Sequence, residues 1–257
     1  MIKKLLNQCF TWNKNINIKE YMNISKKLID VFNEYNIELS DEKSLKIEKF
    51  NNLMLEYNQI HNLTTLTSEF DVIYKHYLDS VLIINNIPDN CKIIDLGCGG
   101  GFPSIPLKIL NESLNFTAVD SVGKKTTFVN NAKNELKLNN FDVINSRIED
   151  LAYKNEFREK YDIVVSRALA PLSTVIEYSA PFLKNGGKII SYKGANYKEE
   201  IKNSTNAFQK LNCRLVDTVK FYIKETDTYR YFLIIEKFKD IPKNYPRKQN
   251  KPRIQPL

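Results

Sequence analysis

The sequence contains few of the residues that define several protein classes. Its 257 residues include only 8 glycines, 9 prolines, 4 cysteines and 2 histidines. So little glycine and proline excludes a collagen-like or low-complexity chain, and 4 cysteines are too few for a disulfide scaffold of this length. Because 42% of the residues are hydrophobic and 26% are charged, we expect an ordinary globular protein with a sizeable core.

The cysteines and histidines are also badly spaced for a metal site. His61 and His76 are the only imidazoles, and no two thiols stand at C-x-x-C spacing among Cys9, Cys91, Cys98 and Cys213. This scatter predicts no structural zinc site and no other metal centre. We expect the thiols to be small, mostly buried apolar groups and not disulfide partners.

Long hydrophobic runs are absent as well. Apolar runs such as residues 81–84 fall far short of the roughly 20 residues that cross a bilayer. At the basic amino-terminal end, Asn7 and Gln8 interrupt the apolar residues before a signal-peptide core can form. We therefore predict a cytoplasmic protein with no membrane partner, and a monomer.

The charge is positive and unevenly distributed. The chain has 38 Lys and Arg against 30 Asp and Glu, a net charge of +8. Residues 237–257 carry seven of these cations and one acid, Asp240, so +6 of the total lies in this one segment. Four prolines between residues 242 and 256 oppose a long helix. Residues 241–257 are therefore predicted to form an extended basic strap, which suits a nucleic-acid backbone.

The first third of the chain has helical periodicity. Residues 1–40 form an extension with one modest helical pattern near its end. Apolar residues then recur every three or four positions over 41–57, with Ser40 as N-cap, and a second helical pattern covers 68–86. We predict that residues 41–88 form a helical cap segment.

After Pro88 the pattern changes to short apolar runs that alternate with helical segments. Five runs are expected to be strands, at residues 91–95, 116–120, 141–144, 161–165 and 188–192, and the clearest helix between them covers 124–138. This alternation predicts a parallel sheet covered by helices on both faces. Residues 215–222 and 229–236 are two further strands joined by a polar turn, which predicts a closing antiparallel hairpin in a domain over 89–240.

A glycine-rich turn follows the first strand directly. Gly97, Gly99 and two more glycines precede Pro103, which is expected to begin a helix. Glycines here let the backbone approach a ligand closely, at the edge where open α/β sheets bind nucleotides. Asp95 stands two residues before the first glycine, and Asp120 ends the next strand, where a carboxylate can accept hydrogen bonds from both ribose hydroxyls. This context, more than the glycines themselves, predicts a nucleotide site.

The choice of nucleotide falls between a nicotinamide dinucleotide and S-adenosylmethionine. The dinucleotide fingerprint G-x-G-x-x-G needs its third glycine at position 102, which is Phe102. A dinucleotide also needs free amides for its pyrophosphate, whereas S-adenosylmethionine carries a sulfonium cation and no phosphate. The acids Asp95, Asp120 and Glu149, at strand ends or just beyond, suit a cationic ligand. We therefore predict S-adenosylmethionine as the cofactor.

The motifs also resemble a known family. The D-x-G-x-G-x-G turn, the acid that ends the second strand and the closing hairpin resemble the class I methyltransferases. An ordered series of motifs is similar to the bacterial 16S ribosomal RNA guanine-N7 methyltransferase family called RsmG or GidB: Asn62-Leu63-Thr64, Lys75 to Ser80, Asp95 to Leu107, Asp120-Ser121 with Lys124-Lys125, Ser166-Arg167-Ala168, Lys193-Gly194 and Tyr245-Pro246-Arg247. The resemblance covers about residues 40–257, and residues 1–25 look like an extension.

The resemblance implies an α/β, Rossmann-like fold of the class I methyltransferase type, a mostly parallel seven-stranded sheet with a closing antiparallel hairpin. It also implies methyl transfer from S-adenosylmethionine to N7 of a guanine in 16S ribosomal RNA, either free or in the small ribosomal subunit. Gly97 and Phe102 would line the cofactor pocket, and the residues at 148–149 would approach the adenine. The full set expected at the cofactor is Asp95, Gly97, Gly99, Phe102, Asp120, Ile148, Glu149 and Arg167.

The absence of two motifs limits which atom of the base can be methylated. Methylation of exocyclic amines usually needs an Asn-Pro-Pro-Tyr-like motif after the fourth strand, and cytosine C5 methylation needs a cysteine there, but residues 166–169 read SRAL. Guanine N7 exposes a lone pair and no proton, so in-line attack needs no general base and rests on alignment. Arg167 is the one catalytic candidate, and its competing role is a simple pair with Asp162 or Glu149. His76 is expected to pack between helix and sheet.

Seven cations are expected to contact RNA: Lys124, Lys125, Lys193, Arg230, Arg247, Lys248 and Arg253. Surface solvation is the competing account for the two lysines at 124–125, and a structural clasp is the competing account for residues 245–247. The strap is predicted to lie away from the cofactor side of the sheet. Three alternatives stay open: a different RNA as acceptor, a small molecule or protein as acceptor, and a non-catalytic RNA-binding role.

Overall fold

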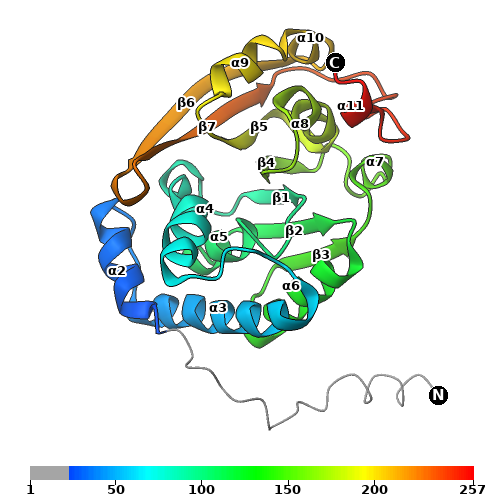
Figure 1. The fold of residues 1–257 in the computed structure, drawn as a ribbon. Coiled ribbons are helices and arrows are strands. Elements are labelled where there is room, and N and C mark those ends of the chain that lie inside the picture. Colours follow the sequence, from blue (N-terminus) through cyan, green and yellow to red (C-terminus); the bar gives the residue numbers. More distant parts are fainter. Residues whose placement is uncertain (1–22) are drawn as a thin grey trace, which may run out of the picture.

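A seven-stranded sheet forms the centre of the protein. The computed structural model describes residues 23–257, so Cys9 and most of the expected extension over 1–25 lie outside the described residues. The strands are ordered β3-β2-β1-β4-β5-β7-β6 (Figure 1). Their bounds are β1 (Lys92–Leu96), β2 (Asn115–Asp120), β3 (Phe141–Asn145), β4 (Tyr161–Arg167), β5 (Leu183–Lys193), β6 (Cys213–Ile223) and β7 (Thr228–Lys237). The first five strands are parallel, and β7 runs antiparallel to both β5 and β6, which confirms the predicted fold class.

Strand β5 differs most from its prediction. It begins five residues before the predicted start at 188. Leu183 pairs with Tyr161, and the next paired residues are Lys188 and Ile163, so residues 184–187 bulge out of the ladder. Residues 185–187 read NGG and are typical of a turn. Because pairing with β4 resumes after the bulge, these residues lie within one longer strand.

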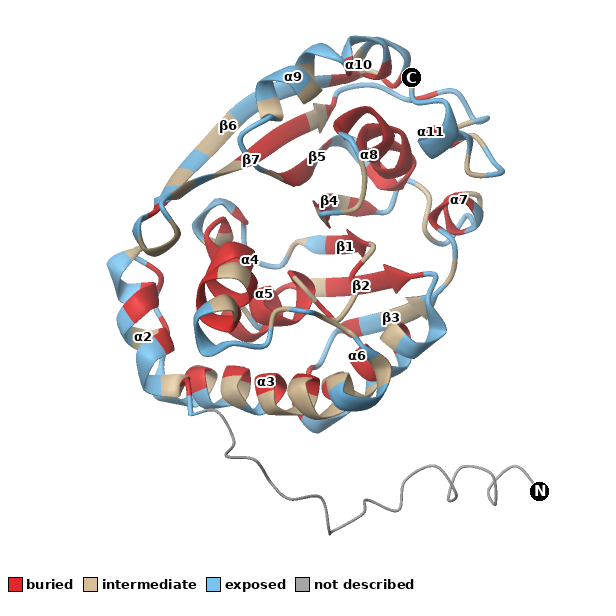
Figure 2. Ribbon diagram, viewed as in Figure 1, coloured by how far each residue is buried: buried red, intermediate tan, exposed pale blue. Residues whose placement is uncertain are grey.

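Helices cover both faces of the sheet. The hydrophobic core on one face includes side chains of α2 (Ser25–Glu34), α3 (Asp41–His61), α5 (Ser104–Leu110) and α6 (Gly123–Glu135). The other face packs on α7 (Ile148–Leu151), α8 (Leu172–Ser179), α9 (Tyr197–Lys202) and α10 (Thr205–Lys210). Neighbouring residues such as Ile93 and Ile94 face opposite cores because strand side chains alternate. Figure 2 shows the buried residues on the sheet and on the inward sides of the helices.

Helix α3 confirms the predicted helix over 41–57 and continues to His61. The Ser40 side chain accepts a hydrogen bond of 3.3 Å from the Lys43 N–H, as expected of an N-cap. Asn62 ends the helix with a left-handed φ of 47°. The helix lies along the outside of α5 and α6 (Figure 1).

The second predicted helix, over 68–86, is irregular. It consists of a π-helical segment, η1 (Asp71–Leu78), one turn named α4 (Asp79–Val81) and a 3₁₀ turn, η2 (Ile84–Asn86). The Asp79 N–H reaches back to the Tyr74 carbonyl, five residues earlier. The Lys75 carbonyl instead accepts a hydrogen bond of 2.6 Å from Arg167 at the end of β4. A tertiary contact that the periodicity does not encode therefore accompanies the wider turn.

The carboxyl-terminal segment is docked on the protein and is not a free strap. The Tyr153 hydroxyl oxygen lies 2.9 Å from the Asn244 carbonyl and 2.8 Å from the Pro246 carbonyl, so its one proton can be donated to either. The Thr174 hydroxyl on α8 donates to the Pro252 carbonyl at 2.6 Å. A short helix, α11 (Lys251–Ile254), also interrupts the segment that was predicted to be extended. Within residues 23–257, no helix has the length and apolar character needed to span a membrane.

Candidate active site at the carboxyl edge of the sheet

The glycine turn after β1 is closely packed at two of its four glycines. Gly97 has a φ of +79°, and a Cβ added there would lie 2.7 Å from Leu169 Cδ1. A Cβ on Gly101, with a φ of +91°, would lie 2.7 Å from Ile105 Cδ1. The backbone N–H groups at 97 and 98 both donate to the Val119 carbonyl, which ties the turn to β2. The loop conformation therefore requires glycine at these two positions.

Asp120 at the end of β2 holds the loop in place. One carboxylate oxygen accepts a hydrogen bond of 3.0 Å from the Gly99 N–H, and the other accepts one of 2.9 Å from the Val122 N–H. Each oxygen of a carboxylate can accept a second hydrogen bond, so capacity for ligand hydroxyls is left. Asp120 also lines the cavity beside the loop.

This first cavity has a volume of about 450 Å³ and lies at the carboxyl ends of β1, β2 and β4. Four of the predicted cofactor residues line it, namely Gly97, Asp120, Ile148 and Glu149. Tyr178 also lines this cavity, and no motif in the sequence pointed to it. The Tyr178 hydroxyl donates to Glu149 Oε1 at 3.0 Å, and burial together with this carboxylate raises the pKa of Tyr178 to about 12. Glu149 is thereby held in a fixed position at the cavity wall.

Asp95 lies behind the loop and lines neither this cavity nor the next. Its carboxylate is fully buried, and in the described part of the chain neither oxygen has a hydrogen bond of good geometry. Burial raises the pKa of Asp95 to about 7, and the nearby Ser104 hydroxyl opposes this rise without forming a well-aligned hydrogen bond. The predicted cofactor role of Asp95 is therefore not one of direct lining.

Phe102 packs in an aromatic cluster under the cap segment, outside the residues that line the two cavities. Its ring stacks on His76 with centroids 4.6 Å apart and lies 5.3 Å from the Phe50 ring. The His76 Nε2 lies 3.0 Å from the Thr64 hydroxyl oxygen. Burial first, and the Arg167 charge second, lower the pKa of His76 to about 4, so the imidazole is neutral at pH 7. This geometry agrees with the packing role expected for His76.

A second cavity, of about 570 Å³, adjoins the first. Ala168 and Leu169, directly after β4, line both. Three of the predicted functional cations also line the second cavity, namely Arg167, Lys193 and Arg230. Two ligands, one in each cavity, would therefore lie next to each other at the end of β4.

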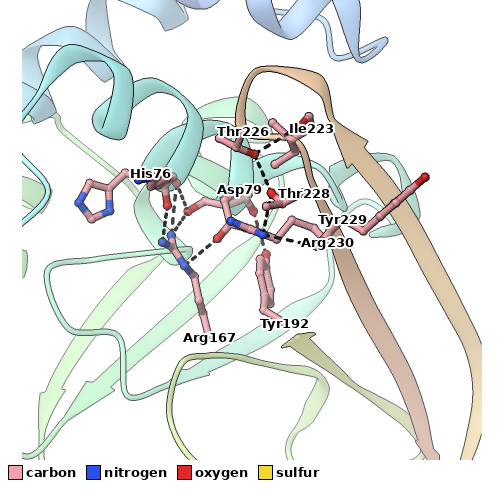
Figure 3. Close-up of polar contacts among 11 residues, drawn as sticks. His76, Asp79, Arg167, Tyr192, Ile223, Thr226, Thr228, Tyr229 and Arg230 are labelled. Atoms are coloured by element: carbon pink, nitrogen blue, oxygen red, sulfur yellow. Dashed lines mark hydrogen bonds and ion pairs between the residues drawn. The ribbon is translucent and has the colours of Figure 1, made fainter. Parts of the chain in front are cut away.

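Asp79 from the cap segment joins two of these cations (Figure 3). Its carboxylate lies 3.0 Å from Arg167 Nε and 2.7 Å from Arg230 Nε. Arg167 also donates to the Ser80 hydroxyl at 2.8 Å and to the carbonyls of Lys75 and His76. The competing prediction that Arg167 pairs with Asp162 or Glu149 is wrong, because the cap segment supplies the carboxylate. The resulting network ties the cap segment to β4 and β7.

Arg230 keeps free donors in this network. Its Nη1 donates to the Thr228 hydroxyl at 3.2 Å and to the Tyr229 carbonyl at 3.4 Å. Among the described residues, its Nη2 has no hydrogen-bond partner. Lys193 Nζ, in contrast, already has two partners, the Glu200 carboxylate at 2.6 Å and the Ala170 carbonyl at 3.2 Å. Arg230 therefore offers the second cavity a positioned cation with open donors.

The other predicted RNA contacts are dispersed. Lys124 donates to the His61 carbonyl at 2.9 Å, whereas Lys125 lines the first cavity. Lys248 lies over the Tyr153 ring, with Nζ 4.6 Å from the centroid.

Within residues 23–257, no three His, Cys, Asp or Glu side chains form a metal-binding group.

The predicted position of the strap is wrong. Asn250 and Arg253 line the first cavity, and Arg253 donates to the Leu169 carbonyl at 3.1 Å. The reason is Arg247, whose guanidinium and backbone N–H bind the buried carboxylate of Glu177 on α8 at 2.7 to 2.9 Å. This contact between Arg247 and Glu177, the clasp, directs the chain over α8 to the first cavity. The sequence analysis did not predict a functional role for Asp79, although this residue belongs to the quoted motif over 75–80. No motif in the sequence pointed to Glu177.

Comparison with known proteins identifies the family. The profile of the rRNA small subunit methyltransferase G family matches residues 43–228. A Clostridium botulinum ribosomal RNA small subunit methyltransferase G is 37% identical over 240 residues, which are 93% of this chain and 99% of the relative. The chain belongs to the rRNA small subunit methyltransferase G family. Another member, from Lachnoclostridium phytofermentans, is 39% identical over 223 residues, covering 86% of this chain and 92% of its own.

Membership in the methyltransferase G family confirms the resemblance and the enzyme class predicted from the sequence. A solved Pyrococcus horikoshii protein, described as a putative transferase, has a similar fold, with a TM-score of 0.52 over 63% of each chain and 12% sequence identity. That likeness concerns the fold alone.

Proposed function

We propose that this protein transfers a methyl group from S-adenosylmethionine to N7 of a guanine in 16S ribosomal RNA. The observation that carries the proposal is the pair of adjoining cavities at the carboxyl edge of the sheet, which share Ala168 and Leu169. The first cavity presents the Asp120 and Glu149 carboxylates to the cofactor, and the second presents the free donors of Arg230 to a nucleotide. Donor and acceptor would meet across the end of β4.

The first cavity fits the cofactor in size and chemistry. Its volume of about 450 Å³ falls in the range of small-molecule sites. The Asp120 carboxylate, oriented by two backbone N–H groups, would accept from the ribose hydroxyls, and Ile148 with Glu149 would border the adenine. The Gly97 backbone lines this cavity, and the Leu169 side chain packs against it. Bound here, S-adenosylmethionine supplies an electrophilic methyl group on a sulfonium sulfur.

The second cavity suits an acceptor atom that carries no proton. Its two carboxylates are committed to cations, Asp79 to two arginines and Glu200 to Lys193. Guanine N7 already presents a lone pair, so the reaction needs no group to remove a proton. The protein would contribute by holding the base in line with the methyl group and excluding alternative orientations. Arg230 Nη2 would bind an oxygen of the incoming nucleotide.

Methyl transfer with labelled cofactor tests the proposal. Purified protein, tritiated S-adenosylmethionine and small ribosomal subunits or 16S RNA that lack the modification should give label in the RNA. Borohydride reduction followed by aniline should then cleave the RNA at one labelled guanine, since only N7 methylation makes guanosine sensitive to that treatment. Labelling of a base other than guanine, or of protein alone, would reject the proposal.

A further inference from the structure

Four tyrosines form a continuous row of rings beside the second cavity. Tyr197 at the start of α9 stacks on Tyr231, with ring centroids 4.1 Å apart. Tyr231 is followed by Tyr229 at 6.3 Å and then by Tyr222 at 5.0 Å. We call these four residues the tyrosine ladder. No motif in the sequence analysis includes any of them.

The strand register explains why the rings share one face of the hairpin. Tyr222 and Tyr229 are directly opposite each other on β6 and β7, and Tyr231 lies two residues beyond Tyr229. Residues two apart in a strand project from the same face. Tyr231 also lines the second cavity, so one end of the ladder lies at the site proposed for the guanine. The row extends from that site toward the hairpin tip.

Core packing does not account for the outer rings. Tyr222 and Tyr229 are 45% and 44% exposed, with Tyr222 on the edge strand β6 and Tyr229 on the neighbouring strand β7. In Figure 3 the Tyr229 side chain points away from the network of Asp79 and Arg230. Exposed aromatic rings in a row on an edge hairpin are an exposed apolar surface of the kind that binds partners.

The outer rings are held in position and accompanied by a cation. The Tyr222 hydroxyl donates to the Asp227 carboxylate at 2.8 Å, which orients the ring. The Lys220 ammonium lies 3.8 Å from the Tyr229 ring centre. Lys220 pairs across the strands with Tyr231, which in turn pairs with Lys193 on β5, so cations lie in the same row as a ring. Such a surface combines stacking platforms with charge for phosphates.

We propose that the tyrosine ladder binds the unpaired nucleotides next to the methylated guanine, with their bases stacked on its rings. This inference rests on the proposed function, because it extends the nucleotide path from the second cavity outward. Aromatic rings accept any base, and an adjacent lysine neutralises a phosphate of the same strand. The ladder thus favours RNA in which the target guanine lies in a single-stranded segment, over a paired helix whose bases cannot reach the rings.

The test compares three full-length variants. Y222A/Y229A removes both exposed rings, and Y222F/Y229F keeps them while removing the hydroxyls. F238A is the matched control, because Phe238 is 47% exposed and has Arg214 5.5 Å from its ring, yet lies about 30 Å along the hairpin from Tyr229. The probes are a short fluorescein-labelled single-stranded oligoribonucleotide and a duplex of the same length, together with unmodified 16S RNA and small subunits as methyl acceptors.

We expect Y222A/Y229A to raise the Kd for the single strand about tenfold or more, and the KM for 16S RNA in parallel. Duplex affinity, S-adenosylmethionine affinity and melting temperature should change little, and Y222F/Y229F and F238A should stay within about twofold of wild type. Equal single-strand affinity for wild type and Y222A/Y229A would overturn the ladder. So would a defect seen only with assembled subunits, which would place a ribosomal protein on the rings.

The oligonucleotide arm keeps this inference separate from the proposed function. If wild type binds the single strand through the rings but methylates no ribosomal RNA, the proposed function fails and the ladder stands as an RNA-binding surface. If wild type methylates 16S RNA while the rings make no difference to binding or KM, the ladder fails and the function stands.

Discussion

Two glycines of the same loop show how a single residue controls the first cavity. Gly97 has a φ of +79° and no space for a Cβ, whereas Gly100 has open space around its Cβ position. We expect Gly97→Ala to raise the Kd for S-adenosylmethionine about tenfold or more, because backbone strain and displacement of Leu169 would both deform the cavity. Calorimetric titration measures the change. Gly100→Ala is the matched control, and equal affinities in the two variants would contradict this account.

Two buried ionisable residues should affect stability with opposite dependence on pH. Asp95 titrates near 7 in the folded protein, against an ordinary pKa of 3.8, because burial disfavours its charge. Between these values the folded state holds a proton that the unfolded state has released, so this group lowers stability as pH rises from about 4 to 7. Once complete, the effect is on the order of 4 kcal/mol.

His76 acts in the other direction. Its pKa falls from 6.5 to about 4 on folding, chiefly through burial, so only the unfolded state is protonated between those values. This group therefore raises stability as pH rises from about 4 to 6.5 and offsets much of the Asp95 effect. We expect Asp95→Asn to leave stability rising over that range, and His76→Gln to leave it falling. Urea unfolding at several pH values measures both slopes, and parallel slopes in the two variants would refute the assignment.

At the scale of elements, the clasp between the tail and α8 links stability to the cofactor site. Glu177 is fully buried, so removing the Arg247 side chain would leave its carboxylate without a cation among the described residues, bound only by the backbone N–H of residue 247. We expect Arg247→Ala to lower the free energy of unfolding by about 3 kcal/mol. S-adenosylmethionine should also bind more weakly, because the loosened tail carries Arg253 at the first cavity.

Lys243→Ala supplies the control for that experiment, since Lys243 is an exposed cation of the same tail. Thermal unfolding and calorimetric titration on both variants separate a clasp from a general charge effect. An Arg247→Ala protein with wild-type melting temperature and wild-type cofactor affinity would show that the tail contributes neither stability nor cavity shape.

At the scale of the whole molecule, the positive charge should govern RNA affinity through salt. Deleting the tail would remove the clasp, so charge substitutions test the idea more cleanly. We expect Lys243, Lys248 and Lys251, all changed to Gln, to reduce the slope of log affinity against log salt by about 2, at roughly 0.7 per phosphate contact on single-stranded RNA. Filter binding across a salt series measures the slope. An unchanged slope at unchanged melting temperature would exclude these lysines from the interface.

Local features of the sequence determined the sheet and the glycine loop. Alternation of short apolar runs with helical periodicity is a property of neighbouring residues, so it predicted five parallel strands, the closing hairpin and the Ser40 cap. The position of Asp120 followed from the same reasoning, because parallel strands bring their carboxyl ends to one edge. Reasoning from neighbouring residues did not predict the bulge in β5 or the π-helical turn, because both coincide with contacts to distant residues.

The partners of the charged residues depend on long-range packing. Asp79 lies 88 residues from Arg167 and 151 from Arg230 in the chain, and Glu177 lies 70 residues from Arg247. Propensity and periodicity extend over a turn or a strand, whereas these pairs form because packing of the cap, the hairpin and the tail brings them within 3 Å. Neighbouring residues therefore specify the scaffold and its loop, whereas long-range packing sets the partners of the charged residues and the row of tyrosines beside the second cavity.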